Sequence, residues 1–559
     1  MESIVLEPQV ERVLFEEEPL ISFIVPIYDL KPDLLKRCLL SLDDQDYENI
    51  EVICVLDGPN KELERVCLKF VDAQKFKLIE IEHGGACAAR NAGFNISKGH
   101  IVSFFNSDYI AKPGMARMWV DALKNNPDCG FAYGAYEYNT QQRMWYGSKP
   151  FDTFQLDVAN YIDCGFPLWR KYVVDWDVNC KSLQDWDFWL RVVKTHKVKG
   201  HYLGRDISFV AAPPRPKGLS DDSHNNWINR VGYVKEKNGI EKRDIIVTSL
   251  GAPNHGVEIA KMIGADFRDD TIRKPSEYKA LYMIGFFMRP DAIHNEHPEI
   301  LSHYKDMGCK IIVHFIGADI YWLRKFSHES LKFLSGALKK TADHILCENV
   351  NAQKELADMG LPSEVVPIPP YNDYEVKPLP KDFSVSIFLT DKSDFDKYFG
   401  EHTLSIVRAM PDIQFNSYGD GGKDVRYPNL KHVGNLSKEE WKEFVYSNSS
   451  ILRLVRHDTT PLASNEFMLA GRDAISNIPS ECTDYIETKG KEDMNEWDLF
   501  APGFNAYNWP ATKTKIVQLI RQIRKRVIPD ETRVSLHDAL VKRFDRLTYI
   551  KTIKEMCGL

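Results

Sequence analysis

Three aspartates each stand where an apolar run of the sequence stops. Asp29 closes ISFIVPIYD, Asp57 closes IEVICVLD, and Asp108 closes GHIVSFFNSD. One such acid is routine, because a polar residue must end a buried strand somewhere. Three acids that converge at one sheet edge are less easily explained in that way, and carboxylate oxygens are the ligands that Mg²⁺ or Mn²⁺ prefers.

The elements that would position these acids alternate between short apolar strands and amphipathic helices. Residues 21–29 predict a strand, and one apolar face at helical spacing follows it: Leu34, Leu35, Cys38, Leu39 and Leu42. Unbroken apolar strands with helices between them indicate an α/β fold with a largely parallel, covered sheet. Ligands of such sheets bind at the carboxyl ends of the strands.

The alternation restarts after a polar loop at 211–226 and again after a proline-rich segment at 365–382. The sequence therefore predicts three α/β units and a basic helical tail. We expect boundaries at 1–240, 241–375, 376–525 and 526–559.

Composition excludes several classes of protein. The 559 residues carry a net charge of -8, which argues against general affinity for nucleic acid or anionic lipid. No secretory signal and no apolar run long enough to span a bilayer is evident. The eleven cysteines stand singly and predict buried, reduced thiols, so we expect a cytoplasmic protein.

Several blocks in the first 200 or so residues resemble family 2 glycosyltransferases of GT-A fold. ISFIVPIYDLKPDLLKRCLLSLDDQDYENIEVICVLDGPN looks like the family's first strand, helix and second strand. GGACAARNAGFNISKGHIVSFFNSDYIAKPG looks like its Ala-Arg-Asn helix and the strand with the DxD metal motif. SLQDWDFWLRVV is similar to the block that bears the catalytic base. The resemblance implies transfer of a sugar from a UDP- or GDP-sugar with inversion.

The resemblance implies a role for Asp108 as ligand of a Mn or Mg ion that neutralises the leaving diphosphate. Asn106 replaces the first acid of the motif, and its amide oxygen can ligate a hard cation without bringing charge. We therefore expect weak metal binding until the donor completes the site. Asp57 and the segment from Pro26 to Tyr28 should hold the nucleoside.

The same resemblance implies that Asp185 is the general base for the acceptor hydroxyl. Gln184 replaces the family's common Glu beside it. Arg90 and Asn91 should order the pocket near the diphosphate, and His224 lies where some relatives have a metal ligand. The plainer alternatives are an exposed acidic helix start for Asp185, a surface Arg90, and a solvated loop histidine.

The remaining 300 or so residues resemble a GT-B glycosyltransferase of the family 4 type, with two Rossmann-like domains. RHDTTPLASNEFMLAGRDAISN is similar to that family's E-x7-E segment, with Asp458 and Glu466 as the two acids. Lys392 and Lys397 have the spacing of its two diphosphate-binding basic residues. Two lysines on a solvated helix face remain the alternative. IIVHFIGAD is expected to bring His314 and Asp319 near the cleft.

The leading hypothesis is a tandem enzyme that adds two sugars to a glycan, protein or nucleobase acceptor. A second hypothesis is one active GT-A enzyme whose GT-B half binds acceptor or acts as a scaffold. A third is a non-catalytic carbohydrate- or nucleotide-binding protein. Donor turnover distinguishes the first two from the third.

Overall fold

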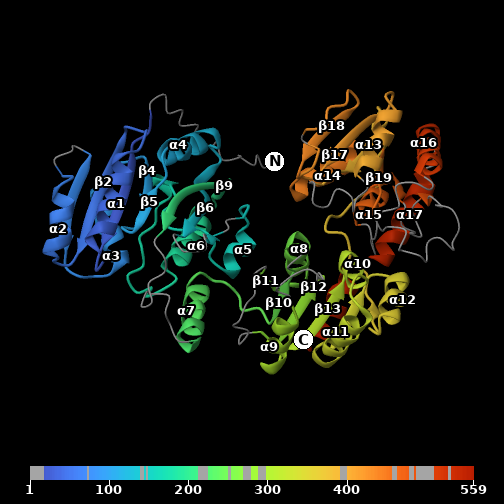
Figure 1. Cartoon of the computed structure of the whole chain (residues 1–559), viewed down its shortest axis with the longest axis horizontal. Helices are drawn as coiled ribbons and strands as arrows, with labels where there is room; N and C mark the ends of the chain where they lie inside the picture. Colours follow the sequence, from blue (N-terminus) through green and yellow to red (C-terminus); the bar gives the residue numbers. More distant parts are fainter. Residues whose placement is uncertain are drawn as a thin grey trace, which may run out of the picture. The chain divides into compact units, whose positions relative to one another are not determined.

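The computed structural model describes most of the chain. The described residues are 18–71, 75–138, 144–146, 149–211, 224–249, 253–268, 278–286, 297–390, 400–422, 424–455, 462–476, 484–485, 509–526 and 530–559. They form two compact units, Met1–Lys242 and Arg243–Leu559 (Figure 1). Within the described residues, no helix is long and apolar enough to cross a membrane.

Unit 1 is built on a nine-stranded mixed sheet in the order β3-β2-β1-β4-β8-β6-β9-β5, with β7 paired to β6. The strands are β1 (Ile21–Ile27), β2 (Ile50–Asp57), β3 (Phe76–Ile81), β4 (Ile101–Phe104), β5 (Tyr109–Ala111), β6 (Cys129–Tyr138), β7 (Met144–Tyr146), β8 (Leu168–Trp169) and β9 (Lys199–Ala211). Strands β1 to β4 are parallel, whereas β8 pairs antiparallel with both β4 and β6.

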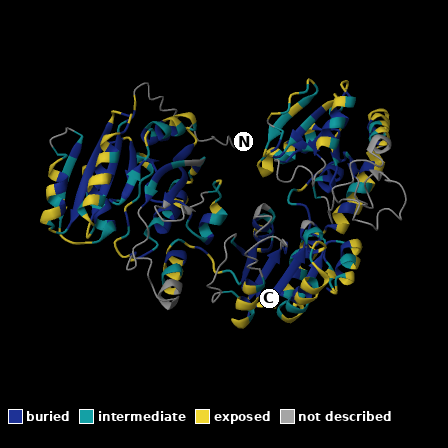
Figure 2. Cartoon of the chain, viewed as in Figure 1, coloured by how far each residue is buried: buried dark blue, intermediate teal, exposed yellow. Residues whose placement is uncertain are grey.

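Seven helices accompany this sheet: α1 (Pro32–Asp43), α2 (Lys61–Leu68), α3 (Ala86–Ile96), α4 (Met115–Asn125), α5 (Thr153–Val158), α6 (Gln184–His196) and α7 (His224–Lys237). Helix α1 buries the predicted stripe, including Leu35, Leu39 and Leu42. Every residue of β2 is buried, which fits a sheet covered on both faces (Figure 2). The sequence predicted β1, β2 and β4 but not β3, whose segment FKLIEI carries charge and is only partly buried, nor β5 to β9.

Unit 2 contains two six-stranded parallel sheets. The first has the order β11-β10-β12-β13-β14-β15 and the second has the order β18-β17-β16-β19-β20-β21. The first sheet comprises β10 (Ile245–Thr248), β11 (Asp266–Arg268), β12 (Ala280–Ile284), β13 (Lys310–Phe315), β14 (His344–Cys347) and β15 (Glu364–Val365). The second comprises β16 (Ser384–Phe388), β17 (Gln414–Tyr418), β18 (Leu430–Gly434), β19 (Ser450–Arg453), β20 (Asp473–Ser476) and β21 (Asp484–Tyr485).

The helices of unit 2 are α8 (Pro253–Ile263), α9 (His297–Asp306), α10 (Ala318–Leu323), α11 (His328–Thr341), α12 (Val350–Asp358), α13 (Gly400–Ala409), α14 (Lys438–Ser447), α15 (Leu462–Leu469), α16 (Trp509–Lys525), α17 (Asp530–Arg543) and α18 (Arg546–Met556). Eight of the strands of unit 2 lie in apolar runs of the sequence that read as strands, as the alternation predicted: β10, β12, β13, β14, β16, β17, β19 and β20. The four that it missed are β11, β15, β18 and β21, which all lie away from the sheet centres.

The packing of α3 against the sheet can be tested, and it matters because α3 carries two residues of the predicted site, Arg90 and Asn91. A Cβ added at Gly93 would lie 2.5 Å from Ile24 Cγ2 and 3.0 Å from Val55 Cγ2. We predict that Gly93→Ala lowers the free energy of unfolding by about 1–3 kcal/mol through overpacking. Gly232→Ala is the matched control: that exposed position in α7 has nothing within 4 Å, so the same change should stabilise by about 0.5–1 kcal/mol. Equal effects in chemical denaturation would contradict this packing.

Candidate active site

The three predicted aspartates lie at one edge of the unit 1 sheet. Strands β2, β1 and β4 are parallel neighbours, so their carboxyl ends point the same way. Asp57 is the last residue of β2, Asp29 follows the end of β1, and Asp108 precedes β5. The edge predicted from the strand pattern therefore exists.

Asp57 is buried and holds the turn that opens α3. Its carboxylate accepts hydrogen bonds from the amides of Gly84 at 2.7 Å and Gly85 at 3.0 Å. Gly85 has a φ of 87°, a conformation that favours glycine. His83 Nδ1 lies 3.1 Å from the same carboxylate. Asp57 therefore fixes the 83–85 turn against the end of β2.

This turn presents an aromatic pair to solvent. The rings of His83 and Tyr28 stack, with centroids 4.3 Å apart and an interplanar angle of 17°. Tyr28 is 57% exposed although it directly follows the buried strand β1, which contains Pro26 opposite Val55. An exposed aromatic pair fixed by a buried carboxylate is a surface on which a flat ring can stack.

Arg90 occupies the centre of the site and is almost fully buried, at 5% exposure. Nη1 donates to Gln184 Oε1 at 3.2 Å, and Nη2 donates to Asn106 Oδ1 at 3.1 Å and to Cys164 Sγ at 3.4 Å. Its Nη1 is also 4.0 Å from Asp185 Oδ1. The guanidinium thus joins α3 to three other segments of the chain, and the surface alternative for Arg90 is wrong.

Asn91 and Arg90 both contact the segment before α6 through Trp176. The Asn91 side chain donates to the Trp176 carbonyl at 2.8 Å and accepts from its amide at 2.7 Å. The Arg90 guanidinium lies over the indole ring at 4.2 Å, and Phe188 stacks on that ring with centroids 4.2 Å apart. Successive residues of α3 therefore anchor the segment that leads to Asp185.

Asp185 lies in the first turn of α6, where the side chain is 27% exposed. Oδ2 accepts a hydrogen bond from the Cys164 amide at 3.2 Å. Leu183, directly before the helix, has a φ of 57°, which is a strained conformation for leucine. The carboxylate is thus held from two sides while it keeps access to solvent.

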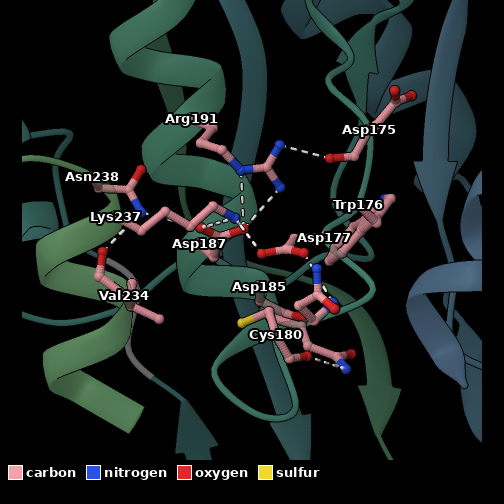
Figure 3. Close-up of polar contacts among 12 residues, drawn as sticks. Asp175, Trp176, Asp177, Cys180, Asp185, Asp187, Arg191, Val234, Lys237 and Asn238 are labelled. Carbon is pink, nitrogen blue, oxygen red and sulfur yellow. Dashed lines mark hydrogen bonds and ion pairs between the residues drawn. The ribbon is translucent and has the colours of Figure 1, made fainter. Parts of the chain in front are cut away.

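Asp187 has a different role, because its carboxylate is buried and locks α6 to α7 (Figure 3). Arg191 donates to it from Nε at 2.9 Å and pairs through Nη2 at 2.8 Å. Lys237 Nζ lies 3.0 Å from Asp187 and 2.6 Å from Asp177, and Asn238 donates at 3.1 Å. The hydrogen bonds to Asp177 outweigh the effect of its burial and lower its pKa to about 2.

A second acid, Asp163, lies close to Asp185. Ligand atoms of Asp163, Cys164 and Asp185 lie within 4.8 Å of one another. Tyr109 donates to Asp163 at 2.7 Å, and the Gly165 amide donates at 2.7 Å. Burial, and next the charge of Asp185, raise the pKa of Asp163 to about 7. Because the Arg90 guanidinium contacts Cys164, this cluster is a poor place for a cation.

The triplet Asn106-Ser107-Asp108 fits a cation only in part. The Asn106 amide oxygen accepts from Arg90, so it faces a positive charge rather than an open ligand position. Asp108 is half-buried at the start of β5 and offers a hard carboxylate ligand. This set suits an ion that takes its remaining ligands from a bound diphosphate.

The other predicted residues are only partly within the described chain. Lys392, Lys397 and Asp458 lie outside the described residues. His224 is the first residue of α7, but its side chain is also outside them.

Glu466 lies in α15 and is buried. Its Oε2 accepts from Trp441 Nε1 at 2.6 Å. Burial raises the pKa of Glu466 to about 7, although hydrogen bonds oppose that effect.

His314 and Asp319 are both fully buried, so neither side chain is open to solvent, and their expected place near a cleft stays a prediction. His314 is fully buried inside β13, where Nδ1 bonds Tyr282 at 2.6 Å. Burial lowers its pKa to about 3. Asp319 is fully buried and accepts from the amides of Phe286 and Ile320 at 2.9 Å each. Both residues hold the first sheet of unit 2 together.

The sequence missed Asp163, Cys164, Trp176, Asp177 and Lys237. They lie in segments without strand or helix periodicity or, for Lys237, in a last helical turn where a lysine is ordinary. The signal available was weak: DCGFPLW and DWDVNC place acids beside buried apolar residues between two predicted elements.

Comparison with known families gives unit 1 its class. Residues 22–173 match the family model described as Glycosyl transferase family 2. This match covers β1 to β8 and the strand-end acids, so unit 1 contains a glycosyl transferase family 2 domain of α/β, GT-A-like fold.

The similar proteins are glycosyltransferases by name. Glycosyltransferase GlyA of Streptococcus pneumoniae serotype 4 is 31% identical over 128 residues, which cover 22% of this chain and 18% of GlyA. The uncharacterized glycosyltransferase RC0461 of Rickettsia conorii is 36% identical over 194 residues, 31% of each chain. The chain spans only 18% to 32% of the length of the first three relatives.

Solved structures are similar at a lower level. S. aureus TarS 1–349 in complex with UDP-GlcNAc is 13% identical with a TM-score of 0.32, covering 52% of this chain and 80% of that one. A mannosyltransferase of Pyrobaculum calidifontis in complex with GDP-Man and Mn²⁺ is 16% identical with a TM-score of 0.30, covering 38% and 61%.

The raised pKa of Asp163 predicts how the stability of the protein depends on pH. The folded protein keeps this proton up to about pH 7, whereas the unfolded chain releases it near the ordinary aspartate pKa of 3.8. The free energy of unfolding should therefore fall as pH rises from about 4 to 7. We predict that Asp163→Asn removes this loss. From pH 5 to pH 8 the free energy of unfolding of the variant should rise by at least about 1 kcal/mol relative to that of the unchanged protein.

Calorimetry of the variant and of the unchanged protein between pH 5 and 8 measures this difference. The control is Asp121→Asn, an exposed acid on α4 that should not change the pH dependence. Parallel stability curves for Asp163→Asn and the unchanged protein would show that Asp163 is ionised in the fold.

Proposed function

We propose that unit 1 transfers a sugar from a nucleotide-sugar to an acceptor hydroxyl, with inversion at the anomeric carbon. The observation that carries the proposal is Asp185, a partly exposed carboxylate held at the site by the Cys164 amide and Arg90. A carboxylate in this position accepts the proton of the acceptor hydroxyl as that oxygen attacks, which contributes about 10²–10⁴-fold to the rate.

The donor would bind along the carboxyl ends of β1, β2 and β4. The Tyr28–His83 pair offers a stacking surface for the base, and Asp57 holds the turn behind it. Pro26 shapes the same strand end. The resemblance of the sequence blocks around β1, β2 and β4 to family 2 glycosyltransferases supports this placement of the donor.

Asp108 and Asn106 would lie beside the diphosphate. A Mn²⁺ or Mg²⁺ ion there supplies positive charge to the leaving diphosphate. Asp108 contributes a carboxylate ligand, whereas the Asn106 amide is held by Arg90. We infer that the ion binds weakly without donor, and that His224, at the start of α7, is a further candidate ligand.

Nucleotide-sugar turnover tests this function. We predict that Asp185→Asn lowers kcat by about 100-fold or more and leaves donor affinity unchanged, because the base acts on the acceptor. Asp108→Asn should instead weaken donor binding in the presence of Mn²⁺. Asp175→Asn is the control, an exposed acid of the same segment. The absence of thermal stabilisation by any UDP- or GDP-sugar, with or without Mn²⁺, would overturn the proposal.

We further propose that unit 2 is a GT-B glycosyltransferase of the family 4 type that performs a second, retaining transfer. In its second sheet the strands follow the order 3-2-1-4-5-6 of dinucleotide-binding folds when numbered from β16. Nucleotides bind such sheets where the order reverses, between β16 and β19 here. Glu466 follows β19 and would hold the ribose. Lys392 and Lys397 follow β16 in the sequence, and Asp458 follows β19.

The proposed domains are the glycosyltransferase 1–240, the two Rossmann-like domains 241–375 and 376–525, and the helical tail 526–559. The acceptor would be a glycan, protein or nucleobase. A cytoplasmic site of action suits the ten described cysteines, which are all buried and in no disulfide.

Two alternatives for unit 2 follow from the burial of Glu466, whose carboxylate already bonds Trp441. A degenerate half would bind acceptor or act as a scaffold beside one active enzyme. A chain without turnover in either unit would be a carbohydrate- or nucleotide-binding protein.

Glu466→Gln separates these alternatives while it preserves the side-chain shape. We predict that the variant loses a second nucleotide-sugar binding event, measured by calorimetric titration of the Asp185→Asn protein. Glu443→Gln, on the exposed face of α14, is the control. If Glu466→Gln binds every donor as the unchanged protein does, the proposal of a second donor site fails.

A further inference from the structure

Three arginines are buried in the described part of the chain: Arg90, Arg472 and Arg533. Arg90 has the carboxylate of Asp185 4.0 Å away. Neither Arg472 nor Arg533 forms an ion pair with a carboxylate of the described residues. A buried charge without a partner of opposite charge is costly. The two arginines of unit 2 therefore lack the kind of partner that Arg90 has in unit 1.

Arg472 stands between α15 and β20 and bonds neutral groups. Its Nη1 donates to the carbonyls of Lys377 at 2.6 Å and of Ala470 at 2.8 Å. Its Nη2 donates to the carbonyls of Pro378 at 3.0 Å and of Tyr446 at 3.1 Å. These four hydrogen bonds fix the guanidinium, but a carbonyl oxygen brings no negative charge to neutralise it.

Arg533 lies in α17 and is only 8% exposed. Within the described residues its guanidinium makes no hydrogen bond and no ion pair. One turn further along this helix, His537 Nδ1 donates to the Leu469 carbonyl at 2.8 Å, so this face of α17 packs against the end of α15. Burial, and next the positive charge of Arg533, lower the pKa of Arg472. The two guanidiniums are therefore near enough to repel each other.

The nearby acids do not relieve this repulsion. Asp473 directly follows Arg472 and lies 4.0 Å from Arg526. Asp530 and Glu531, in the first turn of α17, are both exposed. A lysine in such a place can lose its proton, whereas an arginine stays charged in a protein. The missing negative charge must therefore come from an anion outside the described residues.

We propose that Arg472 and Arg533 form a phosphate-binding site in unit 2. A phosphate group carries about 1.5 to 2 negative charges near pH 7 and several acceptor oxygens, so it matches two guanidiniums in charge and in hydrogen bonding. Nε of Arg533 is shielded from solvent, whereas its two Nη atoms are not fully shielded, so an anion can reach them. Arg472, fixed by its four carbonyl partners, supplies the second positive charge.

This site lies at the opposite edge of the second sheet from the proposed donor site. Strands β16, β19 and β20 are parallel. The donor would bind at the carboxyl ends of β16 and β19, whereas Arg472 directly precedes β20, at the amino end of that strand. Arg472 also holds the carbonyls of Lys377 and Pro378, in the segment between β15 and β16. The phosphate would therefore bind beside the connection between the two sheets, away from a donor diphosphate.

Calorimetric titration of the full chain with inorganic phosphate, at constant ionic strength, tests the site. We expect Arg533→Gln to weaken phosphate binding by about 10-fold or more, because the variant loses charge-assisted hydrogen bonds. Arg533→Lys, which keeps the charge but not the fork, should bind with intermediate affinity. Arg521→Gln removes an exposed charge of α16 and is the matched control, which should bind as the unchanged protein does.

Ribose 5-phosphate, titrated in parallel, separates two sources of the same group. Tighter binding of inorganic phosphate indicates the free ion, and tighter binding of the sugar phosphate indicates a phosphorylated metabolite; in either case Arg533→Gln must weaken it. If neither compound binds, or if Arg533→Gln binds both as the unchanged protein does, the inference is wrong.

Thermal unfolding provides a second measurement. In phosphate-free buffer Arg533→Gln should unfold at the same temperature as the unchanged protein or at a higher one, because it removes an unpaired buried charge that repels Arg472. Added phosphate should raise the unfolding temperature of the unchanged protein by more than that of the variant. A variant that is less stable without phosphate would show that Arg533 has a partner within the protein, which overturns the inference. Neither measurement depends on the proposed sugar transfer.

Discussion

The side chain of Arg90 is only 6% exposed, so its guanidinium must find hydrogen-bond partners inside the protein, and unit 1 is arranged around that requirement. Arg90 on α3 reaches the turn after β4, the segment before β8 and the first turn of α6. Each of these segments carries one of the polar side chains of the site. The need to satisfy one buried cation therefore brings together groups that the sequence separates widely.

Helix α6, which carries Asp185, has a second restraint. Asp187 lies two residues after Asp185, but its side chain is buried and pairs with Arg191 and Lys237. Breaking a buried pair of this kind is costly, because it leaves an uncompensated charge. The two acids in QDWD therefore have different roles. Asp187 fixes α6 to α7, and Asp185 stays accessible at the site.

Unit 2 shows how far a strand pattern predicts function. Its two parallel sheets were expected, and the order of the strands in the second sheet reverses between β16 and β19. Glu466 lies in α15, which follows β19 in the sequence, and its carboxylate accepts a hydrogen bond from Trp441. His314 in β13 and Asp319 in α10, which the sequence expected near a cleft, are both fully buried. Residue type and position on a strand do not by themselves show which way a side chain faces.

The sequence by itself determined the α/β class, the central strands, the stripe of α1 and the sheet edge where Asp57 and Asp108 lie. Those features follow from local periodicity and from the rule that parallel strands share a carboxyl edge. Only the tertiary structure decided that Asn106 and Gln184 meet on Arg90, that Asp163 approaches Asp185, and that Lys237 joins Asp177 to Asp187. These contacts join segments far apart in the chain, and irregular segments give no periodic signal of where their side chains point. Burial then sets the charge of each group, and burial is a property of the folded chain.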